Sequence, residues 1–210
     1  LGDVYKRQDL CMGSKADEPI NRRLVMFVPF YMQEYFNKAQ IVDKEGQTRP
    51  LVAKEEKIVI TGKTPADFVS RGITPMQSAS LLLILVAGIS IYGIRRGKTL
   101  WGIDLILFLV AGMAGCILAF LALFSQHPAV SPNYILFVFH PFHLFCLPFM
   151  LSRVRKREIS RYMLVNFAVL TLFIGLWTII PQRIPPAVLP LALCLLIRSA
   201  SNLILTYKRK

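Results

Sequence analysis

Charged residues are scarce in the second half of this 210-residue chain. They make up 18% of the sequence and most of them lie before residue 76, whereas hydrophobic residues make up 54% and form long runs after it. A soluble domain of similar size carries roughly 25% charged residues. The balance therefore favours a lipid-facing protein over a soluble one.

Cysteine and histidine are also rare. Of the four cysteines, Cys11 stands alone, and Cys116, Cys146 and Cys194 fall in three separate apolar runs. Their spacing indicates neither a disulfide framework nor a zinc site. The three histidines offer no ligand set drawn from two helices. We expect no metal and no cofactor, and these patterns assign no catalytic residue.

The net charge of +13 is of a size found in nucleic-acid-binding proteins. Many of the basic residues, however, stand in short clusters between apolar runs, where cationic loops set membrane topology and meet anionic headgroups. We expect membrane lipids, and not nucleic acid, as the partner.

Five apolar segments follow one another after residue 77. They cover residues 78–94, 101–124, 134–151, 162–180 and 187–205. Crossing a hydrocarbon core of about 30 Å takes roughly 20 residues of helix. One such run could be a buried helix of a soluble protein, but five in succession, separated mostly by loops that contain charged residues, indicate membrane spans. The predicted fold class is an all-α membrane protein, a five-helix transmembrane bundle preceded by a small α+β extramembrane fragment.

Basic residues are divided unequally between the loops. Eleven follow the first, third and fifth segments, whereas the alternate loops contain only Arg183. Lysine and arginine are retained on the cytoplasmic side of a membrane. We therefore predict an N-terminal segment outside the cytoplasm and a cytoplasmic tail at residues 206–210.

The part before the apolar segments divides into three. Residues 1–8 resemble translated sequencing-adapter read-through and are predicted to be a non-native scar. Residues 9–61 have the pattern of an extramembrane domain, and residues 62–77, with two prolines and two glycines, that of a linker.

Local signals predict several elements within residues 9–61. Asn21 can cap a helix that begins at Arg22, and Pro29 suits the first turn of a helix over residues 30–39. Residues 41–52 have the pattern of a hairpin, and residues 57–61 that of one more strand.

Two charged residues and two histidines lie within the apolar segments: Asp104, His140, His143 and Arg198. A central arginine costs roughly 2.5–3.5 kcal/mol on insertion scales, so Arg198 should face the bundle and pair with Asp104, or snorkel to the interface. His140 and His143, spaced i, i+3 on the third segment, could ligate haem or a metal, but structural hydrogen bonding is the favoured interpretation.

The second segment carries a stripe of small residues. Ala111, Gly115 and Ala119 recur at every fourth position, with Gly112 beside them. Such a stripe lets a neighbouring backbone approach closely. A ligand groove along the stripe is the less favoured alternative.

Three motifs before the membrane segments carry a resemblance to a known family. They are Asp9-Leu10-Cys11-Met12-Gly13-Ser14-Lys15-Ala16-Asp17-Glu18-Pro19, Met26-Phe27-Val28-Pro29-Phe30-Tyr31-Met32 and Arg49-Pro50-Leu51-Val52. In this order they resemble the end of the periplasmic domain in Lnb-type proteins of Bacteroidetes, where G-x-x-A-D-x-P precedes M-F-L-P-x-Y-L and R-P-L-V. Val28 and Met32 replace the leucines usual there. Residues 124–128 and Asn133 look like a loop of the five-helix domain that follows in the same family.

The resemblance implies lipoprotein N-acyl transfer, in which an acyl chain moves from the lipoprotein's glyceryl group to its N-terminal cysteine amine. It implies a papain-like periplasmic domain whose nucleophilic cysteine lies upstream of these residues, so Cys11 receives no catalytic role. The chain is then expected to be a fragment of a multi-pass bacterial inner-membrane protein. Expected partners are membrane lipids, lipoproteins and its own upstream periplasmic domain. His127 and Asn133 match the family's outer loop and are expected at a lipid-facing mouth.

Two functions are compatible with the sequence. One is the membrane half of an acyltransferase-like enzyme that presents lipid, and the other is a non-enzymatic anchor or scaffold for an outer domain. A lateral opening near His127 and Asn133 would favour the enzyme, and closed packing the anchor. A transporter is disfavoured because the sequence contains neither an inverted repeat nor an array of intramembrane charges.

Overall fold

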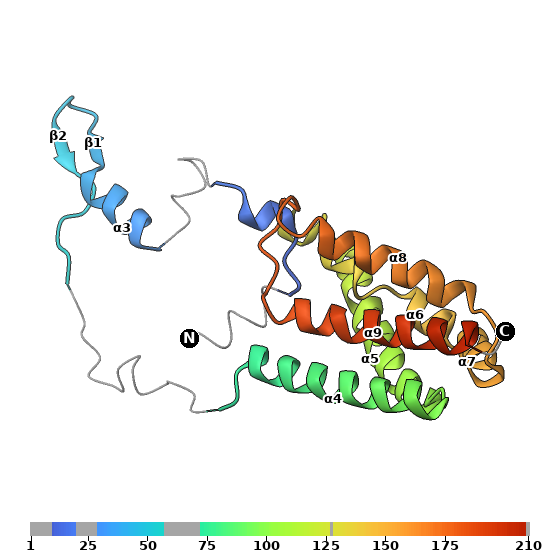
Figure 1. Ribbon diagram of the computed structural model, residues 1–210. Helices are drawn as coiled ribbons and strands as arrows, with labels where there is room; N and C mark the ends of the chain where they lie inside the picture. Colours follow the sequence, from blue (N-terminus) through green and yellow to red (C-terminus); the bar gives the residue numbers. More distant parts are fainter. Residues whose placement is uncertain (1–9, 20–28, 57–71, 127, 209–210) are drawn as a thin grey trace. The chain divides into compact units, whose positions relative to one another are not determined.

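The computed structural model describes residues 10–19, 29–56, 72–126 and 128–208 (Figure 1). The chain divides into two compact units. One unit joins Leu1–Asp17 to Val69–Lys210, and the other is Glu18–Phe68. Residues 10–17 therefore belong to the same unit as the membrane helices, although the sequence pattern predicted them to be part of the extramembrane domain.

The smaller unit contains a helix and a hairpin. Helix α3 (Pro29–Lys38) leads into antiparallel strands β1 (Gln40–Val42) and β2 (Thr48–Pro50). Gly46 has a φ of 79° in the turn between them, a conformation that favours glycine. The helix predicted over residues 30–39 and the hairpin are confirmed. The helix predicted at Arg22 and the strand predicted at residues 57–61 lie outside the described residues.

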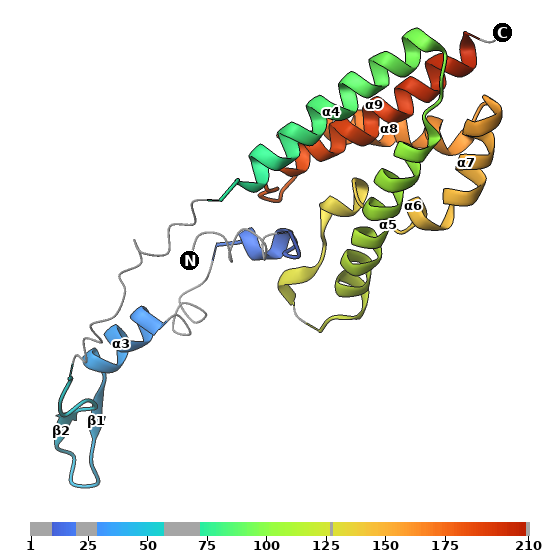
Figure 2. The same cartoon turned by 90° about the horizontal axis from the view of Figure 1, so that it is seen from below.

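Four longer helices form the frame of the membrane unit. They are α4 (Pro75–Arg96), α5 (Trp101–Phe124), α8 (Arg161–Gly175) and α9 (Val188–Tyr207). Helices α4 and α8 pack on either side of α9 (Figure 1). Helix α5 is inclined to the α4–α9 pair (Figure 2). Among the described residues α4, α5 and α9 are each long and apolar enough to cross a membrane alone.

Helix α4 begins earlier than predicted. Thr74 forms a capping box with Gln77: its hydroxyl accepts from Gln77 N (3.2 Å), and the Gln77 side chain accepts from Thr74 N (2.9 Å). Pro75 occupies the first turn, where its missing N–H has no cost. Residues 75–77 of the predicted linker thus belong to the first span.

The third segment is not the single helix predicted over residues 134–151. It consists of η4 (Tyr134–Phe137), α6 (Phe142–Phe145) and α7 (Leu147–Lys156), and α7 is bent by 77° from what precedes it. Pro141 and Pro148 stand at the two breaks. Proline lacks the N–H that continues a helix and its ring clashes with the preceding turn.

The fourth segment is helical over a shorter stretch than the predicted 162–180. Helix α8 has 15 residues and ends at Gly175, which gives a length of about 22 Å. Hydrogen-bonded turns continue the chain from Leu176 to Ile180. Glycine has a low helix propensity and marks the end.

The stripe of small residues on α5 packs against the broken third segment. A Cβ on Gly115 would stand 2.5 Å from the carbonyl carbon of His140, and one on Gly112 would stand 2.6 Å from Leu144 N. The close backbone approach predicted from the sequence is confirmed, and protein rather than a ligand fills this stripe.

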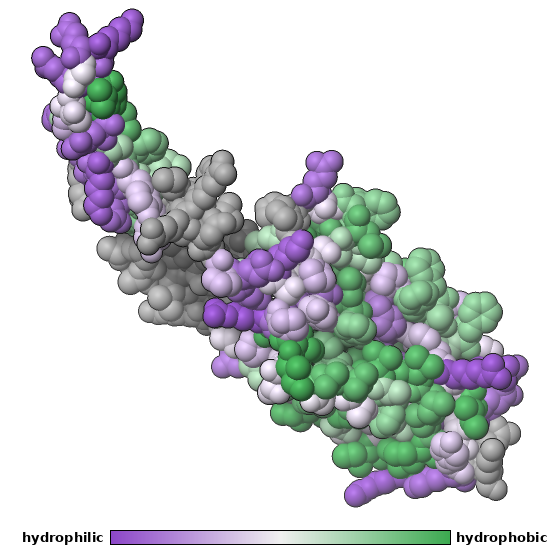
Figure 3. All heavy atoms as spheres, turned by 90° about the horizontal axis from the view of Figure 1, so that it is seen from above, coloured by the Kyte–Doolittle hydropathy of each residue, from purple (hydrophilic) through white to green (hydrophobic). Residues whose placement is uncertain are grey.

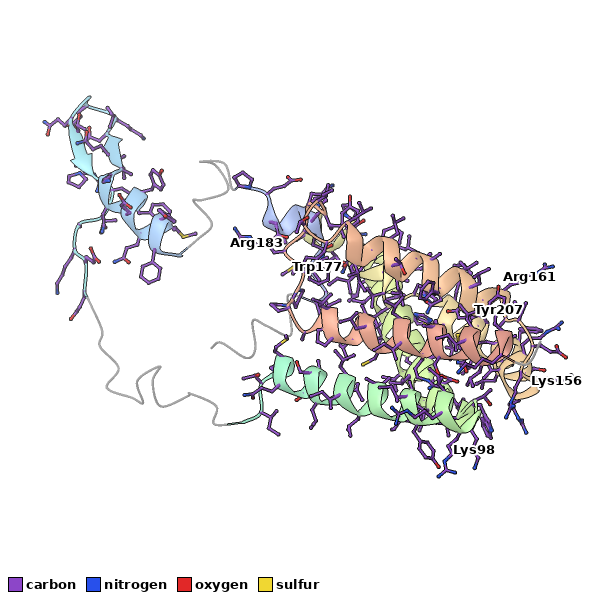
Figure 4. All side chains as sticks on the ribbon, in the orientation of Figure 1. Lys98, Lys156, Arg161, Trp177, Arg183 and Tyr207 are labelled. Atoms are coloured by element: carbon purple, nitrogen blue, oxygen red, sulfur yellow. The ribbon has the colours of Figure 1, made fainter. Side chains whose placement is uncertain are left out.

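The two ends of the membrane unit differ in charge. Lys98, Lys156 and Arg161 lie at one end, which we call the basic end, and Trp177 and Arg183 lie at the other, the loop end (Figure 4). Apolar side chains cover most of the flank between the ends (Figure 3). The exposed ones include Leu81, Ile84, Leu85, Ile106, Val110 and Phe120. The predicted all-α membrane fold is confirmed, with α7 and α8 departing from straight full-length spans.

Candidate functional site

Residues 10–17 are held against two loops at the loop end of the membrane unit. One loop, residues 128–133, joins α5 to η4, and the other, residues 181–187, joins α8 to α9. We call these two loops the seat. Gly13 N donates to Ala129 O at 2.7 Å, and Ser14 N donates to Pro132 O at 2.8 Å. These bonds pair the backbone of the N-terminal segment with the first loop.

Asn133 ties the segment to the helix that follows the first loop. Its Oδ1 caps η4 by accepting from Ile135 N (3.0 Å), and its Nδ2 donates to Leu10 O (3.2 Å). The side chain is 6% exposed. Asn133 was expected at a lipid-facing mouth, but its polar atoms bind within the protein. His127, expected beside it, lies outside the described residues.

Gln182 links the second loop to the same cluster. Its Nε2 donates to Met12 O (2.9 Å) and to Asn133 Oδ1 (3.2 Å), and its Oε1 accepts from Tyr134 N (2.7 Å). The side chain is buried. Sequence reasoning missed Gln182. The available signal was an amide side chain next to Arg183 in a proline-rich turn between two apolar segments.

Gly13 and Asp17 give the G-x-x-A-D pattern a physical role. A Cβ on Gly13 would stand 2.4 Å from Pro132 O, so only glycine lets the two backbones meet. Residues 14–17 form the short helix η1 (Ser14–Asp17). From its end the Asp17 carboxylate accepts from Arg183 N at 2.7 Å. Both loops of the seat therefore bind the segment.

An apolar groove lies beside the seat. It has a volume of about 680 Å³ and lies between the first turns of α4 and α9, with Leu10 on one side. Its lining includes Pro75, Ala79, Leu82, Pro186, Val188 and Leu191. Ligand pockets in proteins span roughly 300–1,000 Å³, so the groove has the size and the apolar character to take a lipid chain.

A buried ion pair lies toward the basic end. Arg198 donates to both carboxylate oxygens of Asp104, from Nε at 2.7 Å and from Nη2 at 3.1 Å, and the two residues are 1% and 0% exposed. Arg198 also donates to Ser90 Oγ (3.0 Å) and Thr99 O (2.9 Å), and Asn202 donates to Asp104 (3.0 Å). The predicted pair is present, and it joins α4, α5 and α9 rather than lining a cavity.

His143 has the structural hydrogen bonds expected from the sequence. Its Nε2 lies 2.9 Å from Val138 O, which can only accept, so Nδ1 accepts the 2.6 Å hydrogen bond from Tyr162 Oη. The two bonds close the bend of the third segment onto α8. His143 is 0% exposed, which fits a packing role.

His140 stacks on His143 with ring centroids 3.8 Å apart, although Pro141 breaks the helix that was predicted to carry both. His140 Nδ1 is buried without a hydrogen bond. So is Asn166 Oδ1, while Asn166 Nδ2 donates to Ser199 Oγ at 2.9 Å. Within the part of the chain that the structure describes, no three His, Cys, Asp or Glu residues gather closely enough to hold a metal ion.

The profile of one protein family, the Lnb transmembrane domain, matches residues 67–210. This chain belongs to that family. No curated protein and no solved structure matches it. The matched part of the Lnb transmembrane domain includes all five membrane segments, both loops of the seat, and the groove except for Leu10.

The family match confirms the membrane half of the resemblance seen in the sequence. The motifs in residues 9–52 precede the matched range. Gly13 and Asp17 of the first motif nevertheless bind loops of the Lnb transmembrane domain directly.

Proposed function

We propose that this Lnb transmembrane domain anchors a preceding extramembrane domain and fixes its position at the membrane surface. The observation that carries the proposal is the attachment of residues 10–17 to both loops of the seat. A simple tether needs only a covalent link, and its residues would keep their freedom. Ordering a segment costs roughly 1–2 kcal/mol per residue in backbone entropy. The hydrogen bonds to the seat oppose this cost and hold residues 10–17 in one position.

Fixed placement matters for transfer chemistry. Holding a reacting group near its substrate converts a bimolecular step into one within a complex. In Lnb-type acyl transfer, as the resemblance implies it, a cysteine thiolate would attack the ester carbonyl and release the glyceryl hydroxyl. The lipoprotein's amine would then attack the thioester and release the thiol. Both carbonyls stay at the membrane surface, where a domain held by the seat can reach them.

We further propose that the groove beside the seat takes an acyl chain of the lipid substrate. Its lining is almost wholly apolar, and it lies where the first turns of α4 and α9 meet residues 10–17. A chain in the groove would leave its ester next to the seat. Lipoproteins and membrane lipids are the proposed partners, and the proposed catalytic cysteine lies in the preceding domain.

The charge asymmetry supports an orientation for this arrangement. Lys98, Lys156 and Arg161 mark the basic end, and the loop end lies opposite. Because basic loops are retained in the cytoplasm, we propose that the seat faces the periplasm and that the protein resides in a bacterial inner membrane.

A non-enzymatic anchor is the alternative, and the groove distinguishes the two. Ser78 is an exposed residue that lines the groove, whereas Leu81 is 56% exposed and does not line it. In the complete protein, Ser78→Trp should fill the groove and lower the conversion of lipoprotein N-termini, measured by mass spectrometry of the acylated peptide. Leu81→Trp is the control and should leave conversion unchanged.

An anchor without lipid presentation gives a different result. Both tryptophan variants would then behave as the wild-type protein does, provided that both accumulate in the membrane to equal levels. Loss of acylation in both variants would also contradict the groove, because it would trace the effect to the helix rather than to the lining.

A further inference from the structure

The bend of the third segment opens a cavity at the basic end. Helix α7 turns away by 77° from the preceding part, and α8 begins five residues after α7 ends. Between α7 and the first turn of α8 lies a cavity of about 1040 Å³. It is distant in the chain from the groove beside the seat and shares no residue with it.

Both cations and apolar side chains line this cavity. Arg153, Lys156 and Arg161 line it together with a single carboxylate, that of Glu158. Glu158 Oε2 accepts from Arg153 Nη1 at 2.5 Å. The lining as a whole is therefore positive.

The apolar part of the lining comes from α7, from its N-cap residue and from the turn between α7 and α8. It consists of Cys146, Phe149, Met150 and Ile159. Phe149 is 76% exposed, so its ring stands on the outer surface of α7 where lipid chains can meet it. Ser152 and Ser160 add two hydroxyl-bearing residues to the lining.

A second cavity adjoins the first on α7, shares Ser152 and Lys156 with it, and shows where this helix lies relative to a bilayer. It has a volume of about 480 Å³ and is lined by Trp101, Leu151, Arg155 and Lys156 among others. The Arg155 guanidinium lies 4.8 Å from the centre of the Trp101 ring. Tryptophan and arginine together are typical of the headgroup level of a membrane, so α7 lies at that level.

We propose that the cavity between α7 and α8 binds an anionic glycerophospholipid. The phosphodiester accepts hydrogen bonds from Arg161 and Lys156 at the rim, and one acyl chain lies along Phe149. Basic pockets between membrane helices favour anionic headgroups in this way. The apolar half of the lining distinguishes a lipid from a free phosphate ion, and the net positive charge distinguishes an anionic lipid from a zwitterionic one.

Competition on the unmodified protein tests the proposal first. The full chain is purified in detergent and offered phosphatidylglycerol, phosphatidylcholine with the same acyl chains, or inorganic phosphate, and bound lipid is measured by native mass spectrometry. We expect phosphatidylglycerol to be retained at least roughly tenfold better than phosphatidylcholine, and excess phosphate not to displace it. Equal retention of the two lipids, or displacement by phosphate, would overturn the proposal.

Variants then assign the site. Arg153→Gln, Lys156→Gln and Arg161→Gln together remove three cations from the cavity. The matched control removes three from the same end but from outside both cavities, through Arg95→Gln, Arg96→Gln and Lys98→Gln. The first triple variant should lose the preference for phosphatidylglycerol, and the control should keep it. Equal losses would mean that the lipid responds only to overall charge and would refute a defined site.

Discussion

Gly13 and Pro132 touch so closely that a Cβ on residue 13 would stand 2.4 Å from the Pro132 carbonyl oxygen. Real Cβ atoms do not approach an oxygen at that distance, so the contact exists only because residue 13 is glycine. Through this contact the N-terminal segment pairs with the first loop of the seat. The proposed placement of the preceding domain depends on it.

Gly13→Ala is expected to release residues 10–17 from the seat. Overpacking of this kind costs about 1–3 kcal/mol. The few hydrogen bonds that hold this short segment cannot offset that cost. Lys15 is exposed within the segment, and trypsin should cleave after it faster in the variant than in the wild type.

Gly88→Ala is the control for that substitution, because a Cβ on Gly88 meets nothing within 4 Å. Its cleavage at Lys15 should match that of the wild type. If Gly13→Ala is cleaved no faster than Gly88→Ala, residue 13 does not hold the segment.

Gln182→Ala should destabilise the seat by leaving Tyr134 N, a partly buried donor, without its acceptor. An unsatisfied buried group costs about 1–3 kcal/mol, and the contact to Met12 O is lost as well. We expect a lower Tm for the purified protein in detergent. Gln126→Ala changes an exposed glutamine near the same end and should leave the Tm within error. A Tm loss of the same size in both variants would contradict the role given to Gln182.

Arg198→Met should lower the stability of the bundle strongly, because it leaves the Asp104 carboxylate buried without its cation. Breaking a buried pair from one side costs about 3–5 kcal/mol. The double variant Arg198→Met with Asp104→Leu should recover much of this loss. Arg183→Met, at an exposed position, serves as the control. Losses that simply add in the double variant would show that the two residues act independently.

Tyr162→Phe should loosen the contact between α8 and the bend of the third segment. The change removes the hydroxyl that donates to His143 Nδ1 at 2.6 Å and leaves a buried acceptor unpaired, at a cost of about 1–3 kcal/mol. The expected result is a lower free energy of unfolding. Tyr92→Phe, at a ring that is 51% exposed, should cost nothing measurable. Equal effects of the two changes would argue against the histidine contact.

Sequence reasoning reached the straight spans and the ion pair for clear physical reasons. Helix α5 has the predicted bounds because its apolar run stops abruptly at Ser125. The pairing of Asp104 with Arg198 was one of two alternatives that the sequence left open, because a charge in an apolar setting either finds a partner or reaches the interface; the structure shows the pair.

The breaks in the third segment and the contacts of the seat could not be predicted from the sequence, also for physical reasons. Proline is tolerated in membrane helices when neighbours satisfy the freed backbone groups. Pro141 and Pro148 alone therefore do not predict a bend of 77°. The contact between Gln182 and Met12 joins residues 170 positions apart, and no local pattern contains that information. Gly13 is part of the motif that resembles the family, but the requirement for glycine there comes from its contact with Pro132, which only the structure shows.

Amide hydrogen exchange at residues 10–17 of the wild-type protein, followed by mass spectrometry in detergent or nanodiscs, tests the fixed placement most directly. Gly13 N and Ser14 N donate to Ala129 O and Pro132 O, so we predict slow exchange at these two amides and fast exchange at both in Gly13→Ala. Exchange at the rate of an unstructured peptide in the wild type would contradict the seat and, with it, the proposed positioning of the preceding domain.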